Sequence, residues 1–354
     1  MELQTALTQT LYAQLLEEAL SYEVLIFEDG VIGSPYVNIS NEKRYLYWQV
    51  KLPDGTFRRK ALGPETEETK ALVERLLERK SDIQSAIESL KTTTRSFVSS
   101  GGMSVELAHF RVMEWLARAG LFSKAIVVVG SHAFGALGNA LGVRWGSSLK
   151  TTDMDFARPH GIALATPVSD ATLNVENVVK AGDDSFFAVP SLNIKFPATS
   201  LMSRKSKVKI DFLTTIRSKA DTSPIMFPDL GFAAEPLRYM DYLLGGPIVR
   251  GLLVGQYAIP ANFPDPARFA IHKLIVAQER VAGFQTKVQK DVTQAMELVE
   301  ALVEIGRDYE LQEAFAALPE YGYGKVAEKI RKSLTLTDSP AKCAVEVCLA
   351  KLPD

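Results

Sequence analysis

Three aspartates near the middle of the chain have the types and spacing that most suggest chemistry. Asp153 and Asp155 flank Met154, and Asp211 interrupts the apolar alternation of the segment KVKIDFLT. Side chains two residues apart on a β-strand point to the same side, so the first two carboxylates should face one point. Carboxylates held that close repel each other unless a cation neutralises them, and their hard oxygen atoms suit Mg²⁺ or Mn²⁺. An isolated carboxylate in a mostly buried strand is also costly, which favours a function for Asp211.

A Gly-Ser pair before these aspartates predicts a phosphate-binding turn. Gly130 and Ser131 follow the aliphatic run 125–129 and precede a short helical pattern at 132–141. The β-branched residues of the run predict a buried strand. The glycine allows a close backbone approach, while the serine and the first N–H groups of the helix can bind phosphate oxygens.

This order of features resembles the nucleotidyltransferase superfamily, whose catalytic domain has the DNA polymerase β-like fold. The resemblance covers about Leu121 to Thr215. The chain looks especially like bacterial standalone nucleotidyltransferase-domain proteins related to AbiEii/MenT-type toxins. It departs from the compact members of the superfamily in the insert 138–148, which separates Ser131 from Asp153.

The resemblance implies a role for each of these residues. Gly130 and Ser131 would hold the triphosphate of an NTP such as ATP, while Asp153 and Asp155 would bind a pair of Mg²⁺ ions, or of Mn²⁺ ions. Asp211 would bind the ion next to the attacking hydroxyl and help to remove its proton. The protein would then be an enzyme that moves a nucleoside monophosphate to an acceptor hydroxyl and releases pyrophosphate.

A similar lysine, followed by a basic residue and an aspartate, lies on consecutive C-terminal helices of AbiEii-like proteins. Here the helix expected at 266–281 carries Lys273, and the helix expected at 286–305 carries Asp291. The resemblance implies that Lys273 contacts the nucleotide phosphates, that Asp291 orients it or the substrate, and that Arg280 joins them. The alternative is a solvated salt bridge between the helices.

Other residues near the motif have two interpretations each. Lys150 and Arg204 are candidates for neutralising phosphate charge. The basic run from Arg204 to Lys209 fits either a phosphate-facing role or a solvated edge strand. Asp211 could instead be an ordinary edge-strand residue, and His132 either a helix-start residue or a proton shuttle.

The elements around these residues predict an α+β or mixed α/β fold, in which helices surround a nucleotidyltransferase catalytic sheet. Strands are expected at 152–157, 185–196, 208–214 and 251–259, and helices at 1–20, 65–91, 104–118, 266–281, 286–305 and from 311. We expect three parts. Residues 1–100 form an N-terminal module, 101–235 the catalytic core, and 236–354 the rest of the sheet with a helical C-terminal region; the first boundary lies in the Thr/Ser/Gly-rich segment 92–102.

The N-terminal module contains a basic and aromatic β-hairpin. Residues 44–51 alternate as a strand does, and a Pro-Asp-Gly turn leads into a second strand at 56–62. Cationic and aromatic side chains interleave in it: Lys43, Arg44, Tyr45, Tyr47, Trp48, Lys51, Phe57, Arg58, Arg59 and Lys60. They fit nucleic-acid phosphates and bases, and the segment faintly resembles the arm-binding hairpins of phage integrases. The alternative is a small sheet that packs its aromatic residues on the following helix.

Composition narrows the partners and the compartment. The 354 residues include 40 Lys and Arg and 42 Asp and Glu, for a net charge of −2, so nucleic-acid binding would need a local basic patch. Two cysteines, Cys343 and Cys348, predict a reducing compartment, and the absence of a long apolar stretch predicts a cytoplasmic protein without a membrane partner. The acceptor expected first is a tRNA 3′ end or another RNA. Alternatives are a protein hydroxyl, a small molecule, or a non-catalytic binding module; the toxin relatives also imply an antitoxin partner.

Overall fold

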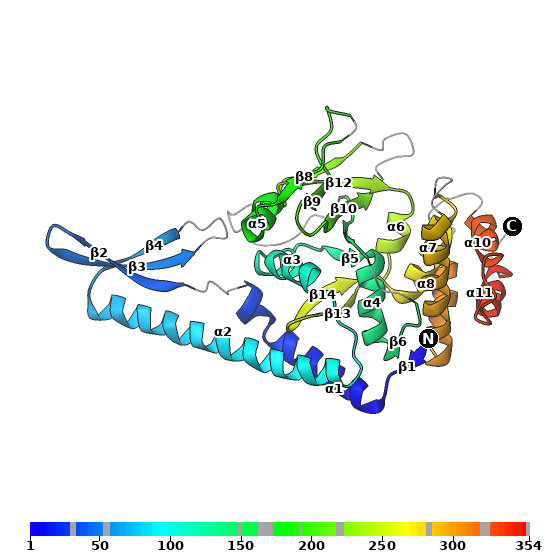
Figure 1. Cartoon of the computed structure of the whole chain (residues 1–354), viewed down its shortest axis with the longest axis horizontal. Coiled ribbons are helices and arrows are strands. Elements are labelled where there is room, and N and C mark those ends of the chain that lie inside the picture. The colour runs from blue at the N-terminus through cyan, green and yellow to red at the C-terminus, as the bar shows by residue number, and fades with distance from the viewer. Residues whose placement is uncertain are drawn as a thin grey trace.

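The computed structural model describes residues 1–28, 33–51, 57–147, 151–161, 173–191, 193–216, 223–280, 285–318 and 326–351. Its centre is a mixed β-sheet flanked by helices, so the expected mixed α/β class is confirmed. In Figure 1 an N-terminal sheet lies at one end of the molecule and the last helices lie at the other.

The central sheet has the strand order β11-β12-β10-β7-β5-β14-β13, with β8 and β9 beside β10. The bounds of these strands are β5 Val127–Val129, β7 Asp153–Arg158, β8 Phe186–Ala188, β9 Ser200–Ser203, β10 Lys209–Thr215, β11 Ile225–Phe227, β12 Phe232–Leu237, β13 Val249–Val254 and β14 Ala258–Phe263. β7 is central: it pairs antiparallel with β5 and parallel with β10. The expected strands at 152–157 and 208–214 are therefore neighbours.

Strict alternation on β7 and β10 separates a core face from a polar face. Met154, Phe156 and Ile210 are fully buried, and the Phe156 ring lies 5.8 Å from that of Phe212. The residues between them are the aspartates, so the same alternation that fills the core directs the carboxylates to the opposite face.

Helices cover both faces of the sheet. Their bounds are α1 Ala6–Ser21, α2 Glu67–Ser99, α3 Leu107–Arg118, α4 Gly130–Ala140, α5 Val175–Gly182, α6 Met240–Leu244, α7 Pro266–Ala277, α8 Gln285–Glu304, α9 Tyr309–Ala316, α10 Val326–Leu334 and α11 Lys342–Leu349. α7 begins where Asp265 caps it and Pro266 occupies its first turn. α7 and α8 pack against each other, which forms one wall beside the carboxylates. Among the described residues, no helix is both long and apolar enough to span a membrane.

The described part of the insert, residues 138–147, packs against the rest of the molecule. Trp145 stacks on Phe134 with ring centroids 4.4 Å apart and donates its indole N–H to the Phe134 carbonyl. The short strand β6, Val143–Arg144, pairs with β1, Glu2–Leu3. Glu297 of α8 then accepts hydrogen bonds from the backbone of Gly146 and Ser147, at 2.8 and 2.9 Å.

The structure corrects several expected elements. The helix expected to end at 91 continues to Ser99, because Thr94 and Phe97 are buried against the core. The strand expected at 185–196 is only Phe186–Ala188, and a turn follows at 193–196. The strand expected at 251–259 is two antiparallel strands, β13 and β14. The expected hairpin has a third strand, β2, Ser34–Ser40, beside β3, Lys43–Lys51, and β4, Phe57–Pro64.

Candidate active site

Three carboxylates meet on the polar face of β7 and β10. Asp155 and Asp211 are direct partners on the two parallel strands, and Asp153 lies two residues before Asp155 on the same face. Val129 at the end of β5 pairs with Asp155 on its other side. Asp155 therefore stands between the Gly-Ser turn and Asp211, where the sequence pattern places the centre of the site.

Gly130 makes room for Asp155. Its φ of +65° is in the left-handed region, and a Cβ built on it would lie 2.0 Å from Asp155 Oδ2. Only glycine tolerates both the backbone angle and this approach. The turn therefore brings the first N–H groups of α4 and the Ser131 side chain next to the carboxylates, as a phosphate-binding turn requires.

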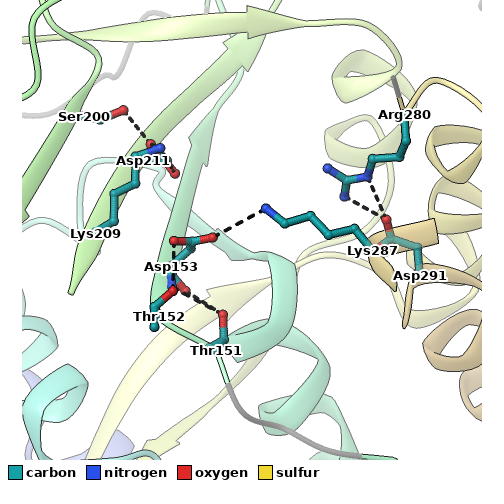
Figure 2. Close-up of polar contacts among 9 residues, drawn as sticks. All are labelled: Thr151, Thr152, Asp153, Ser200, Lys209, Asp211, Arg280, Lys287 and Asp291. Atoms are coloured by element: carbon teal, nitrogen blue, oxygen red, sulfur yellow. Dashed lines mark hydrogen bonds and ion pairs between the residues drawn. The ribbon is translucent and has the colours of Figure 1, made fainter. Parts of the chain in front are cut away.

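Two lysines contact the outer carboxylates. Lys209 Nζ lies 2.7 Å from Asp211 Oδ1 on the same strand, and Ser200 donates a hydrogen bond to that carboxylate as well. Lys287 extends from α8 to within 3.9 Å of Asp153 (Figure 2). The side chains on this face thus combine carboxylates with lysine cations.

A cavity of about 560 Å³ contains all three carboxylates, which suits a nucleotide-sized ligand. Its lining includes Gly130 and Ser131, and its cations come from Lys209, Arg238, Lys273, Arg280, Lys287 and Lys290. A smaller hollow of about 280 Å³ shares Ser131 and Thr151 with it and is lined by His109 and His132. The two imidazoles are in contact, with His132 Nε2 3.3 Å from His109 Nδ1.

Burial and neighbouring carboxylates disfavour the ionised form of Asp155. Burial, and then the carboxylates of Asp211 and Asp153, raise the pKa of Asp155 to about 7. Lys273 and Lys209 lower that pKa only in part. Ionisation of Asp155 is therefore unfavourable, because the carboxyl is buried between two other carboxylates.

These residues fit a divalent cation that a substrate helps to hold. No group of three His, Cys, Asp or Glu side chains that could hold a metal ion occurs within the described ranges. Mg²⁺ does not need one, because one or two carboxylates, waters and substrate phosphates usually complete its shell. Asp155 and Asp211 offer adjacent hard oxygen atoms, and the raised pKa of Asp155 marks the charge that a cation would offset.

A buried ion-pair cluster forms the wall opposite the carboxylates. Lys273 Nζ lies 3.2 Å from Asp291 Oδ1, and Arg280 binds Asp291 Oδ2 at 2.7 Å. Lys273 and Asp291 are 5% and 6% exposed. Burial by itself would raise the pKa of Asp291, but the two cations lower it below its ordinary value. The pair expected on these helices therefore exists and is buried, which excludes the solvated salt bridge.

Removing one member of this pair should destabilise the fold. In Asp291→Asn the Lys273 ammonium stays buried without its anion, so we expect the free energy of unfolding in urea to fall by about 2–4 kcal/mol. The matched control is Glu328→Gln, which breaks a pair with Lys332 whose side chains are 63% and 50% exposed; it should cost less than about 1 kcal/mol. Equal losses in the two variants would contradict this account of the wall.

A second buried group beside this wall makes stability depend on pH. His272 is 8% exposed, its Nε2 has no hydrogen-bond partner among the described residues, and burial with the neighbouring Lys273 lowers its pKa to about 3. The unfolded chain therefore binds a proton that the folded chain does not, between about pH 6.5 and pH 3. The contribution of His272 to stability falls as the pH falls through this window.

The His272→Gln variant should remove that dependence. Between about pH 7.5 and pH 5, we expect the wild-type free energy of unfolding to fall by about 2 kcal/mol more than that of the variant. Urea denaturation at the two pH values measures the difference, with exposed His160→Gln as the control. Parallel pH dependences of wild type and His272→Gln would contradict it.

The remaining candidates from the sequence have different places. Lys150 lies outside the described residues. Arg204 is not brought to the cavity, because its guanidinium lies over the Phe187 ring, 4.9 Å from the centroid. Of the basic run, Lys205 pairs with Asp184 while Lys209 enters the site. Sequence reasoning missed Arg238, which reaches the cavity through the non-local pairing of β12 with β10.

Comparison with known proteins identifies the family of the chain. A family model described as Nucleotidyltransferase matches residues 108–319, which is more than half of the chain and includes every carboxylate and cation of the cavity. The chain belongs to this nucleotidyltransferase family. Neither a curated protein nor a solved structure matches it. Family membership supports transfer of a nucleotidyl group as the activity, and an NTP as the donor.

The nucleotidyltransferase match also extends beyond the expected core. It begins in α3 and ends after α9, so α7 and α8 lie within it. The helix pair that carries Lys273 and Asp291 is thus part of the length that the family model matches, whereas the N-terminal sheet and α2 precede it.

Proposed function

We propose that the protein is a metal-dependent nucleotidyltransferase. It moves a nucleoside monophosphate from an NTP to the 3′ hydroxyl of an RNA, and tRNA is the favoured acceptor. The observation that supports this most is the cavity in which Asp153, Asp155 and Asp211 lie opposite a wall of lysine and arginine side chains. Carboxylates that suit a metal ion and cations that suit a triphosphate face each other across a space of nucleotide size.

The residues of the chain have complementary tasks in this proposal. Gly130 and Ser131 bind phosphate oxygens at the start of α4, and Lys273, held by Asp291, neutralises the β- and γ-phosphates. Lys209 and Lys287 release their carboxylates and contact phosphate oxygens. Asp153, Asp155 and Asp211 would hold two divalent cations, which would supply charge neutralisation and lower the pKa of the attacking hydroxyl.

The proposed reaction is an in-line displacement at the α-phosphorus. A new bond forms between the acceptor oxygen and the α-phosphorus, while the bond from that phosphorus to the bridging oxygen of pyrophosphate breaks. Asp211 accepts the proton of the acceptor hydroxyl. Pyrophosphate leaves with the electron pair of the broken bond, and the lysine and arginine side chains of the cavity stabilise its charge.

The test is label transfer from each α-³²P-NTP to total tRNA, with Mg²⁺ or Mn²⁺ and with pyrophosphate release measured in parallel. We expect label in RNA for at least one NTP, loss of transfer on chelation of the metal, and its return on addition of Mg²⁺. Label in protein would replace RNA with a protein hydroxyl as the acceptor. Absence of label and of pyrophosphate with RNA, protein and small-molecule acceptors would overturn the proposal in favour of a binding module.

The relation to AbiEii/MenT-type toxins, and with it an antitoxin partner, stays a prediction. Its test is growth arrest on expression of the chain, compared with a variant that lacks a site carboxylate. Arrest that depends on the carboxylate is the expected result for a toxin of this kind.

A further inference from the structure

One face of the N-terminal sheet carries three partly exposed tyrosines and an exposed phenylalanine, none of which lines the catalytic cavity. Tyr36, Tyr45 and Tyr47 share one face of β2 and β3, and the register of β4 adds Phe57 to it. Phe57 is 52% exposed, and the Tyr36 and Tyr47 rings lie edge to face with centroids 6.2 Å apart. We call this set, with Lys43 and Arg59, the tyrosine face.

Cations lie among these rings. Lys43 has the same strand parity as Tyr45, and Arg59 lies over the Tyr36 ring, 3.9 Å from its centroid. Arg59 also donates a hydrogen bond to Gln49 Oε1 at 2.9 Å, which fixes its guanidinium over the sheet. The charged groups of the tyrosine face are thus positive, although the whole chain is slightly negative.

The opposite face of the same sheet is buried at its centre. Leu46 and Trp48 are 6% and 4% exposed, and α2 packs against β3 and β4. Trp48 is therefore the most buried aromatic residue of the hairpin, whereas Tyr36, Tyr45 and Tyr47 are only partly buried and keep part of their surface open to a ligand.

The position of the face suits a ligand larger than a nucleotide. The sheet lies at the beginning of α2, whose 33 residues span about 50 Å, and Figure 1 shows it projecting away from the catalytic sheet. A small acceptor bound at the carboxylates would not reach the tyrosine face, whereas a polymer with phosphates and unpaired bases would reach it.

We infer that the tyrosine face binds single-stranded RNA, with bases stacked on its rings and phosphates paired with Lys43 and Arg59. Every base has a flat face that stacks on an aromatic side chain, and an open sheet surface gives unpaired bases room to lie on it. The inference deepens the proposed function, since it names the surface that would hold an RNA acceptor away from its reacting end. Binding without NTP tests it independently of transfer.

The experiment measures binding of a labelled, unstructured RNA of about 20 nucleotides to the full-length protein without NTP or metal, by fluorescence anisotropy. The test variant is Tyr36→Leu/Tyr47→Leu, which keeps apolar bulk but removes the aromatic faces. Its control is Tyr309→Leu, at a 53% exposed tyrosine of α9. We expect the dissociation constant to rise at least about tenfold in the test variant and to be unchanged in the control.

A second variant tests the charges. Arg59→Gln should weaken binding and lower the slope of log K against log salt by roughly 0.7, the value for one phosphate contact on a single strand. Lys332→Gln, at an exposed lysine of α10, is its control. Circular dichroism checks that each variant keeps the wild-type fold.

Three outcomes would overturn the inference: no binding by the wild type, unchanged affinity in both tyrosine-face variants, or equal affinity for DNA of the same sequence. Failure of the proposed function looks different. If no NTP gave transfer but the variants lost RNA binding, the tyrosine face would still be an RNA site on a chain without the proposed activity. Transfer to RNA with unaffected binding in the variants would support the proposed function and exclude the tyrosine face as the RNA site.

Discussion

Asp155→Asn should reduce nucleotidyl transfer by about 10³-fold or more and at the same time make the metal-free protein more stable. In the proposed function, the variant removes a carboxylate that would hold a divalent cation, whose charge neutralisation would supply several kcal/mol of transition-state stabilisation. It also removes a charge whose burial between Asp211 and Asp153 is unfavourable, as the raised pKa of about 7 shows. Activity and stability thus change in opposite directions for the same physical reason.

The raised pKa of Asp155 determines the direction in which Asp155→Asn changes the free energy of unfolding. The folded chain holds a proton on Asp155 between about pH 3.8 and pH 7, whereas the unfolded chain has released it, so the contribution of Asp155 to the free energy of unfolding falls as the pH rises through this window. Above about pH 7 the full cost is present. There, with chelator added, we expect Asp155→Asn to unfold in urea with a free energy about 2–4 kcal/mol greater than that of the wild type.

The control for both measurements is Asp184→Asn, at an exposed aspartate that pairs with Lys205. It should leave transfer and stability unchanged. Near-wild-type transfer by Asp155→Asn would remove this residue from the catalytic centre. An Asn variant that was less stable than the wild type above about pH 7 would contradict the electrostatic account, whatever its activity.

Gly130→Ala should inactivate the enzyme through a single methyl group. The added Cβ would lie 2.0 Å from Asp155 Oδ2, so either the turn or the carboxylate must move. A displacement of about 1 Å in a catalytic constellation can cost about 10²-fold in rate, and we expect a loss of at least that size in label transfer. The left-handed φ adds a stability cost of about 1–2 kcal/mol, measurable by urea denaturation.

Gly306→Ala separates the two effects. Gly306 has a φ of +72°, close to that of Gly130, but nothing lies within 4 Å of the position of its Cβ. Its substitution should have the same backbone cost and leave transfer intact. If both alanine variants lost the same stability and neither lost activity, the close approach of Gly130 to Asp155 would have no catalytic importance.

The centre of the site was predictable from the sequence because its geometry is local. Strand alternation alone places Asp153 and Asp155 on one face and Met154 on the other, and the structure agrees. The pairing of Lys209 with Asp211 follows from the same rule, since the two are two residues apart on a strand. The catalytic and metal-binding roles of these aspartates stay predictions.

The set of lysine and arginine side chains that line the cavity was harder to predict, because it depends on tertiary packing. Arg238 enters the cavity only because β12 lies beside β10, and Arg204 lies outside it, just beyond the end of β9 at Ser203. Neither the pairing of β12 with β10 nor the position of Arg204 has a sequence signal of its own. The same holds for the last turns of α2, where Phe97 is buried in the core and overrides the weak helix propensity of the threonines before it.

Helix α8 connects the two sides of the cavity. Near its beginning α8 carries Lys287 and Asp291, which line the cavity. Farther along, Glu297 accepts hydrogen bonds from the backbone of Gly146 and Ser147, a few residues before β7. One continuous helix therefore supports both the cavity and the segment before β7. We expect a substitution at Glu297 to disturb the cavity from a distance, although the Glu297 side chain does not line it.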